Sequence, residues 1–358
     1  MKRITFVDIS PYKGGAEISL EKLINSLVDD FDINVIVGDK NIWNFHKNVK
    51  VEEISIKKET LLLKKELRNF ILFLKEITCV LKMIDMNSEM IVSNTFKSHI
   101  LVFLYKIKYR NFRWIILERD MYENGIIRVL KRFIYTFSYQ TIFNSNFLKK
   151  RYGLRKGKVL YNIVDRIRES KKDFKIFLYF GDPTFEKGYD RVFEVFEKIN
   201  SILSDTKLVI VTRRESFFGN EYRKNCDFKN VIFKSYEEIE NVLSLSSFLL
   251  FFNRRTETFS RVVAESMSFG VIPLILKGNG MDDYVKTGYN GLVFDHYDPE
   301  VITKKFFEFY NKENLNKVST NCQRVVLKHF SNKRIKEDFI SFIGGKDSPS
   351  HRGGGKKF

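Results

Sequence analysis

Short apolar runs alternate with stretches of helical periodicity along nearly the whole chain, and this alternation most restricts the possible folds. Strand, helix and strand in repeated order is the pattern of a parallel sheet that is covered by helices on both faces. A first series opens the chain. Its expected strands are residues 4–9, 33–37, 90–93, 114–117 and 141–143, and its expected helices are residues 18–27 and 59–84.

A second series of the same kind follows a basic, polar stretch at residues 165–173. Its expected strands are residues 176–180, 207–211, 231–233, 248–252 and 271–276, and its expected helices are residues 190–202 and 260–268. A chain of 358 residues suits two domains of ordinary size. We therefore predict an α/β fold of two Rossmann-like domains that face each other across a cleft.

The expected domain bounds follow from these two series. The N-terminal domain is assigned to residues 1–165 and the C-terminal domain to residues 174–330. A C-terminal helix at 331–343 is expected to pack back towards the N-terminal domain. The glycine-rich tail at 344–358 is low in complexity, and we expect it to be disordered.

Charge and cysteine content narrow the possible functions. The net charge is +18, from 62 basic and 44 acidic residues, and such a field attracts phosphates, nucleic acids or anionic lipids. Three scattered cysteines and five histidines without ligand spacing predict neither a disulfide framework nor a metal site. No apolar stretch is long enough to span a membrane. We expect a cytoplasmic protein that needs no cofactor.

The most informative segment is Asn253–Gly270, which carries two carboxylates eight residues apart. Glu257 is expected in the loop after a buried strand, and Glu265 inside the following helix. Thr258 or Ser260 is the expected helix cap, and Gly270 the expected residue just past the helix end. The first-turn backbone amides would face a bound anion with the positive end of the helix dipole. These amides belong to Thr258, Phe259, Ser260, Arg261 and Val262.

This Glu-x7-Glu segment with its terminal glycine resembles the donor-site motif of the retaining family 4 glycosyltransferases, which have the GT-B fold. The resemblance implies that Glu257 contacts the transferred sugar and Glu265 the ribose hydroxyls. Residues 180–188, Phe-Gly-Asp-Pro-Thr-Phe-Glu-Lys-Gly, are similar to the family's diphosphate loop. By that likeness Gly181 and Lys187 bind the donor diphosphate.

One position departs from the family pattern, because Asp182 stands where the family has an arginine. An acid there would repel a diphosphate. Arg254, just before Glu257, is the expected substitute, and Arg213 and Arg214 are weaker candidates that are equally well explained as solvated surface side chains.

The N-terminal domain offers a second glycine loop and a possible acceptor side. Gly14 and Gly15 follow the first strand, and glycines there let backbone amides approach a phosphate or a sugar closely. A dinucleotide-binding fingerprint would need GxGxxG, which is missing here. Three residues at strand ends are assigned to the acceptor side: Asn94, Glu118 and Arg119.

Two basic clusters in the N-terminal half are interleaved with apolar residues. They consist of Lys64, Lys65, Arg68, Lys75 and Lys82, and of Lys106, Lys108, Arg110 and Arg113. One interpretation is a surface that rests on an anionic membrane, and the other is a set of packed helices with a charged outer face.

Together these patterns predict a retaining, metal-independent glycosyltransferase. It would move a sugar from a UDP- or GDP-sugar to a glycan or lipid-linked acceptor, with peripheral membrane contact. Glu257, Lys187 and Arg254 are its expected catalytic residues. Two alternatives remain open: a catalytically inactive GT-B protein that binds glycan or lipid, and a basic nucleic-acid-binding protein, although no nucleic-acid motif accompanies the charge.

Overall fold

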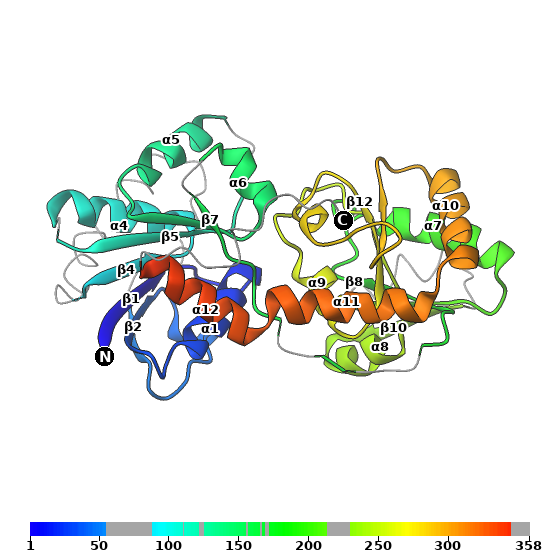
Figure 1. Ribbon diagram of the computed structural model, residues 1–358, viewed down its shortest axis with the longest axis horizontal. Helices are drawn as coiled ribbons and strands as arrows, with labels where there is room; N and C mark the ends of the chain where they lie inside the picture. The colour runs from blue at the N-terminus through cyan, green and yellow to red at the C-terminus, as the bar shows by residue number, and fades with distance from the viewer. Residues whose placement is uncertain are drawn as a thin grey trace. The chain divides into compact units, whose positions relative to one another are not determined.

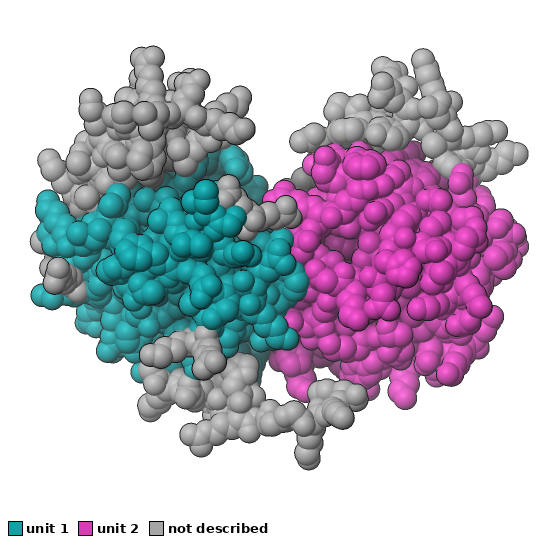
Figure 2. All heavy atoms as spheres, turned by 90° about the horizontal axis from the view of Figure 1, so that it is seen from above, with its two compact units in different colours: residues 1–163, 332–358 teal, residues 164–331 magenta. Residues whose placement is uncertain are grey.

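The computed structural model describes residues 1–54, 88–109, 111–121, 125–154, 157–164, 167–168, 172–212 and 230–344. The chain divides into two compact units, which Figure 2 shows in different colours. Unit 1 consists of Met1–Ile163 with Asn332–Phe358, and unit 2 consists of Val164–Ser331. The expected helix at 59–84 and the tail from residue 345 lie outside the described residues.

Unit 1 is built on a seven-stranded sheet in the order β3-β2-β1-β4-β5-β6-β7, and its strand pairs are parallel. Its strands are β1 (Lys2–Asp8), β2 (Phe31–Val37), β3 (Lys50–Glu53), β4 (Met90–Ser93), β5 (Arg113–Glu118), β6 (Gln140–Phe143) and β7 (Lys158–Val159). Its described helices are α1 (Gly15–Ser26), η1 (Lys40–Ile42), α4 (Phe96–Lys108), α5 (Gly125–Tyr135), α6 (Asn146–Tyr152) and α12 (Asn332–Ile343).

Unit 2 holds a six-stranded parallel sheet in the order β10-β9-β8-β11-β12-β13. Its strands are β8 (Ile176–Phe180), β9 (Lys207–Thr212), β10 (Val231–Ser235), β11 (Phe248–Phe251), β12 (Ile272–Leu276) and β13 (Leu292–Phe294). Its described helices are α7 (Tyr189–Ile202), η3 (Tyr236–Glu238), α8 (Ile239–Leu245), α9 (Arg261–Ser268), η4 (Gly280–Asp283), α10 (Pro299–Lys312) and α11 (Leu315–Phe330).

Helices cover both faces of the unit 1 sheet. Successive side chains of a strand point to opposite faces, so neighbouring residues of β1 pack against different helices. Phe6 packs on the face that α1 and α12 cover, and its neighbour Val7 packs on the other face, against α4, α5 and α6. On the first face, α1 and α12 lie side by side (Figure 1). Phe339 of α12 reaches the ring of Phe6, with 6.3 Å between the centroids.

Each sheet has one point where the strand order reverses. In unit 1, β1 lies between β2 and β4, and in unit 2, β8 lies between β9 and β11. The loops that follow the two central strands at such a point diverge to opposite faces, and they leave a crevice at the carboxyl edge of the sheet where ligands characteristically bind. In unit 2 those loops begin at Gly181 and Phe252, and they carry the residues of the candidate site.

The predicted α/β fold of two Rossmann-like domains is confirmed. β4 and β8 have the predicted bounds, and β1, β2, β5, β6 and β9 differ from theirs by one or two residues at one or both ends. The helix expected after residue 330 is α12, which belongs to unit 1.

Candidate functional site

The loop after β8 brings Lys187 to the loop after β11. Gly188 directly precedes α7 and has φ +67°, a left-handed conformation that glycine adopts without steric cost. A Cβ atom on Gly188 would lie 2.2 Å from the carbonyl oxygen of Phe252. The Lys-Gly pair of the sequence motif therefore has a structural reason, since only glycine lets the two loops lie this close.

Lys187 and Glu257 form an ion pair between these two loops. The Lys187 Nζ donates to Glu257 Oε1 at 2.6 Å, and the Asn253 side-chain amide donates to the same oxygen at 3.1 Å. Both side chains of the ion pair remain partly exposed to solvent. The structure thus brings together two of the three residues that the sequence assigned to catalysis.

A third loop, after β12, fixes the position of Glu257. The Glu257 N–H donates to Asn279 Oδ1 at 2.8 Å, and the Glu257 carbonyl accepts from the N–H of Gly280 at 2.8 Å. The Asn279 amide also donates to the Leu276 carbonyl at 3.0 Å. A Cβ atom on Gly280 would lie 1.8 Å from the carbonyl oxygen of Thr258. Asn279 and Gly280 are positioning residues to which the sequence analysis assigned no role.

Helix α9 begins where the sequence predicted. Ser260 precedes it with φ +57°, and its hydroxyl accepts from the N–H of Val263 at 3.5 Å. The Tyr284 hydroxyl holds this turn by donating to the carbonyls of Phe259 and Ser260. Gly270 follows the helix at φ +75°, which confirms the predicted glycine at the helix end.

Glu265 lies on α9 beside a basic partner on the same helix. Arg261, one turn earlier, donates to Glu265 Oε1, and both side chains are partly exposed. Arg261 was expected to contribute only its backbone amide, so its side chain adds a cation next to the expected ribose contact. Glu257 stands before the helix and Glu265 inside it, as predicted.

Arg254 is paired with an acidic side chain of α7 in this structure. Its guanidinium binds both carboxylate oxygens of Asp190 at 2.6 Å, donates to the Phe185 carbonyl at 2.7 Å, and stacks 3.5 Å from the centroid of the Phe185 ring. These contacts tie the loop after β11 to the start of α7. A role of Arg254 towards a diphosphate stays a prediction, and Arg213 and Arg214 lie outside the described residues.

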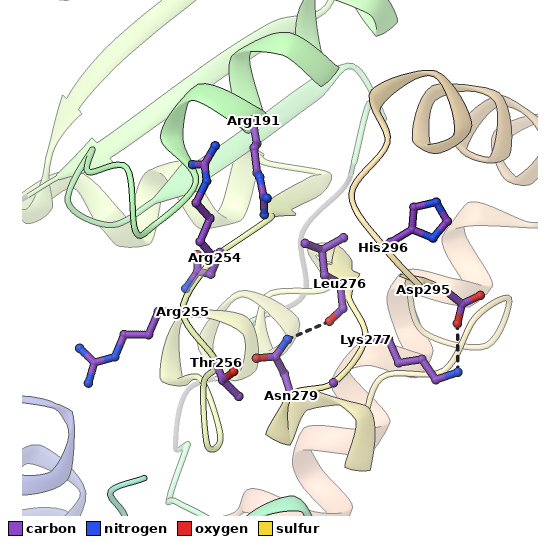
Figure 3. Close-up of a pocket in the computed structure, with 11 residues that line it drawn as sticks. Arg191, Arg254, Arg255, Thr256, Leu276, Lys277, Asn279, Asp295 and His296 are labelled. Atoms are coloured by element: carbon purple, nitrogen blue, oxygen red, sulfur yellow. Dashed lines mark hydrogen bonds and ion pairs between the residues drawn. The ribbon is translucent and has the colours of Figure 1, made fainter. Parts of the chain in front are cut away.

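Beside the Glu257 loop lies a pocket of about 250 Å³ (Figure 3). Its walls come from α7 and from the loops after β11, β12 and β13. The lining residues are Arg191, Asn253, Arg254, Arg255, Thr256, Leu276, Lys277, Gly278, Asn279, Asp295 and His296. Cations dominate this lining, and one of them, Lys277, is bound to Asp295 at 3.0 Å. The carboxyl edge of the unit 2 sheet therefore has a basic hollow next to the Lys187–Glu257 pair.

Unit 1 has a buried polar network at the carboxyl edge of its own sheet. The Asn94 amide donates to Asp8 Oδ2 at 2.7 Å, and Arg119 Nε donates to Asn94 Oδ1 at 2.8 Å. The same guanidinium donates to Asn162 Oδ1. Two residues that the sequence assigned to the acceptor side are thus brought together. Asp8, the last residue of β1, is a member that the sequence analysis missed.

Glu118 does not fit the acceptor role that the sequence assigned to it. Its side chain is only 1% exposed, and Lys131 Nζ donates to both carboxylate oxygens, at 3.0 and 2.9 Å. Burial raises the pKa of this carboxyl above its usual value, and the Lys131 charge offsets part of that effect. Because this ion pair is enclosed inside unit 1, an acceptor does not reach the carboxylate in this structure. For Asn94 and Arg119 the acceptor role stays a prediction.

A backbone amide of the glycine loop after β1 is already hydrogen-bonded within the protein. The Gly14 N–H donates to Glu17 Oε2 at 2.8 Å, so this amide caps α1 internally. The expectation that Gly14 offers its amide to a phosphate does not hold for this conformation. Gly15 is the first residue of α1, and its role towards a ligand stays a prediction.

The basic clusters are only partly visible. The cluster at residues 64–82 and Arg110 lie outside the described residues. In the remainder of the second cluster, Lys106 donates to the Phe112 carbonyl, and Arg113 stacks on Tyr139 at 5.0 Å. None of the described helices is long and apolar enough to cross a membrane.

Comparison with known proteins points in the same direction as the motifs. Residues 163–324, almost all of unit 2, match the family described as glycosyl transferases group 1. An uncharacterized glycosyltransferase of Methanocaldococcus jannaschii is 26% identical over 177 residues, which are 48% of this chain and 49% of that protein. The match thus spans about half the length of this curated relative.

Solved structures match nearly the whole chain. Anabaena HepE in complex with UDP and glucose has a TM-score of 0.74 and 16% identity, and the match covers 96% of this chain and 100% of HepE. Sucrose-phosphate synthase of Thermosynechococcus elongatus has a TM-score of 0.77 and 14% identity, with 96% and 99% covered. These likenesses show the GT-B fold.

Proposed function

We propose that this protein is a retaining, metal-independent glycosyltransferase that moves a sugar from a UDP- or GDP-sugar to a glycan or lipid-linked acceptor. The observation that carries the proposal is the Lys187–Glu257 pair at the strand-order reversal of unit 2. A cation and a carboxylate lie side by side there, and a diphosphate-linked sugar would use the first for its phosphates and the second for its hydroxyls. A cytoplasmic location is part of the proposal.

A bound donor would replace the ion pairs of this site with its own contacts to Lys187, Glu257 and Glu265. The departing diphosphate would bind Lys187 and the first-turn amides of α9, while Glu257 accepts hydrogen bonds from sugar hydroxyls and Glu265 from the ribose. A partly exposed ion pair contributes about 0–1 kcal/mol. A donor therefore opens the Lys187–Glu257 pair at little cost.

The reaction would break the bond between the anomeric carbon and the diphosphate oxygen. Negative charge grows on that oxygen, and preorganised donors aimed at it lower the barrier. The acceptor hydroxyl oxygen would bond to the anomeric carbon on the same face, and its proton would pass to the departing diphosphate oxygen. Lys187 and the α9 amides supply the electrostatic stabilisation, and Glu257 holds the ring in position.

A panel of UDP-, GDP- and ADP-sugars tests this function without a known acceptor. Slow hydrolysis of one UDP- or GDP-sugar is expected, measured as release of the nucleoside diphosphate. Proton NMR of the freed sugar, read before its anomers equilibrate, shows whether configuration is retained. Absence of both binding and hydrolysis across the panel would favour the inactive GT-B alternative.

Glu265→Ala is expected to weaken donor binding, whereas Glu257→Ala mainly lowers turnover. A ribose contact exists in both ground state and transition state, so its loss raises the KM. Sugar orientation matters most at the reacting carbon, so its loss lowers kcat. Steady-state kinetics of donor hydrolysis separates the two effects.

A matched control is available on α12. Asp338 pairs with Arg334 one turn away, as Glu265 pairs with Arg261. Asp338→Ala removes a helical Arg–carboxylate pair that belongs to unit 1 and not to the candidate site in unit 2, and it should leave both kinetic constants unchanged. Wild-type kinetics in both Glu257→Ala and Glu265→Ala would show that the motif is assigned wrongly.

Hydrolysis of the donor is expected to survive EDTA. In the proposed site Lys187 and the α9 amides neutralise the diphosphate, a task that a divalent ion performs in other enzymes. The measurement is the initial rate with and without EDTA, followed by titration with Mg²⁺ and Mn²⁺. A strict requirement for either ion would contradict this part of the proposal.

A further inference from the structure

Helix α5 has apolar side chains on both of its sides. Its inner side packs into unit 1 through Ile134 and Tyr135, which are buried. Its outer side should be polar in a helix that meets only water. Instead, Ile126, Val129 and Phe133 are 80%, 68% and 54% exposed.

These outer residues form a continuous stripe. Leu130 is also exposed, and the spacing 126, 129, 130 and 133 is that of one helical face. Phe137 extends the stripe beyond the helix, with its ring centroid 5.2 Å from that of Phe133. We refer to Ile126, Val129, Leu130, Phe133 and Phe137 as the outer face of α5. Contiguous apolar patches of this kind mark interaction surfaces in soluble proteins.

The charged side chains of α4 and α5 have one sign. Arg128 and Arg132 lie on α5 itself, and Lys106 and Lys108 lie on the neighbouring helix α4. Neither α4 nor α5 contains an aspartate or a glutamate. Large apolar side chains with flanking arginines and no acid are the composition of a helix that lies at an anionic lipid surface.

We propose that the outer face of α5 docks on an anionic lipid bilayer. The apolar side chains would enter the boundary between headgroups and acyl chains, and Arg128 and Arg132 would bind lipid phosphates. The outer face of α5 was not part of the basic clusters in the sequence analysis, although Lys106 and Lys108 of the second cluster lie on the neighbouring helix α4. The inference rests on the proposed function only in explaining why a membrane is useful, since it would bring a lipid-linked acceptor to the enzyme.

The test is co-sedimentation of the full chain with vesicles, either of phosphatidylcholine alone or of phosphatidylcholine mixed with phosphatidylglycerol. Wild type is expected to bind the mixed vesicles and to bind the neutral ones much less. The double variant Val129→Ser, Phe133→Ser should bind the mixed vesicles at least about tenfold more weakly than wild type, since it removes two inserted side chains. Arg128→Ala with Arg132→Ala should reduce the difference between the two lipids.

The matched control is Ile202→Ser with Leu245→Ser in unit 2, where the two side chains are 66% and 61% exposed. This variant should bind vesicles like wild type. Because Phe133 also touches Phe103 and Phe137, Ile126→Ser with Val129→Ser serves as a second variant if the first unfolds. Thermal unfolding checks each one.

Several results would overturn the inference. They are equal binding of wild type to both lipids, wild-type binding by the α5 variants, and a self-association by light scattering that these variants abolish, because the face would then bind a second copy. Donor hydrolysis measured without vesicles should be the same in all these variants. Loss of hydrolysis from every preparation, wild type included, would count against the proposed function and not against the docking surface.

Discussion

Lys187→Ala is expected to lower turnover of the donor about 10²–10³-fold. Lys187 is the cation that the structure places next to Glu257, at 2.6 Å. In the proposed reaction it stabilises charge that is larger in the transition state than in the bound donor, so its loss lowers kcat more than donor binding. The measurement is donor hydrolysis at saturating donor, with UDP inhibition as a separate readout of nucleotide binding.

Two controls keep this result interpretable. Lys198→Ala removes a lysine from α7 that pairs with Glu300, away from the candidate site, and it should retain full turnover. Lys187→Ala leaves Glu257 without its cationic partner, so the double variant with Glu257→Ala reports whether that uncompensated carboxylate contributes to the loss. Full activity of Lys187→Ala with saturating donor would refute the assigned role.

Asp8→Asn is expected to flatten the dependence of stability on pH between about 4 and 7. Burial, followed by the nearby Glu17 charge, raises the pKa of Asp8 from 3.8 to about 7. Hydrogen bonds from Asn94, Ser10 and Thr95 oppose this shift only in part. Between the two pKa values the folded state binds more protons than the unfolded state, so the free energy of unfolding falls as pH rises.

The size of this effect makes it measurable. A shift of about three pKa units corresponds to about 4 kcal/mol, present in full below the unfolded pKa and lost as pH rises through about 7. Urea unfolding from pH 4 to 8 measures it. Slopes are compared, because an asparagine facing Asn94 also shifts stability at every pH. Asp32→Asn, at an exposed residue of β2, controls for the lost charge. Equal slopes in wild type and Asp8→Asn would contradict the prediction.

The fold was predictable because parallel strands are buried on both faces and read as unbroken apolar runs. β8, Ile-Phe-Leu-Tyr-Phe, is such a run, and its bounds were predicted correctly. α5 escaped prediction for the opposite reason. Its apolar side chains Ile126, Val129 and Phe133 are exposed while Lys131 is buried, which is the reverse of the arrangement expected for a helix whose apolar face packs on the core.

The candidate site was predictable where a motif carries its own chemistry. Lys187 and Glu257 each follow a buried strand, and the order of strands around β8 brings them together. Asn279 acts only through contacts with a loop distant in sequence, which no local pattern shows. The ion-pair partners of Glu118 and Arg254 could not be predicted from the sequence either. Tertiary packing brings Lys131 to Glu118 and Asp190 to Arg254.

The return of α12 to unit 1 sets the order in which this chain can finish folding. Unit 2 is one continuous stretch, so it is complete once residue 331 has left the ribosome. Unit 1 is interrupted by unit 2, and the ring of Phe6 packs against Phe339, which is synthesised only after unit 2. Until then an apolar strip of the first unit stays uncovered on the nascent protein. A release of the chain before α12 would leave that strip exposed, so truncation at residue 331 favours aggregation.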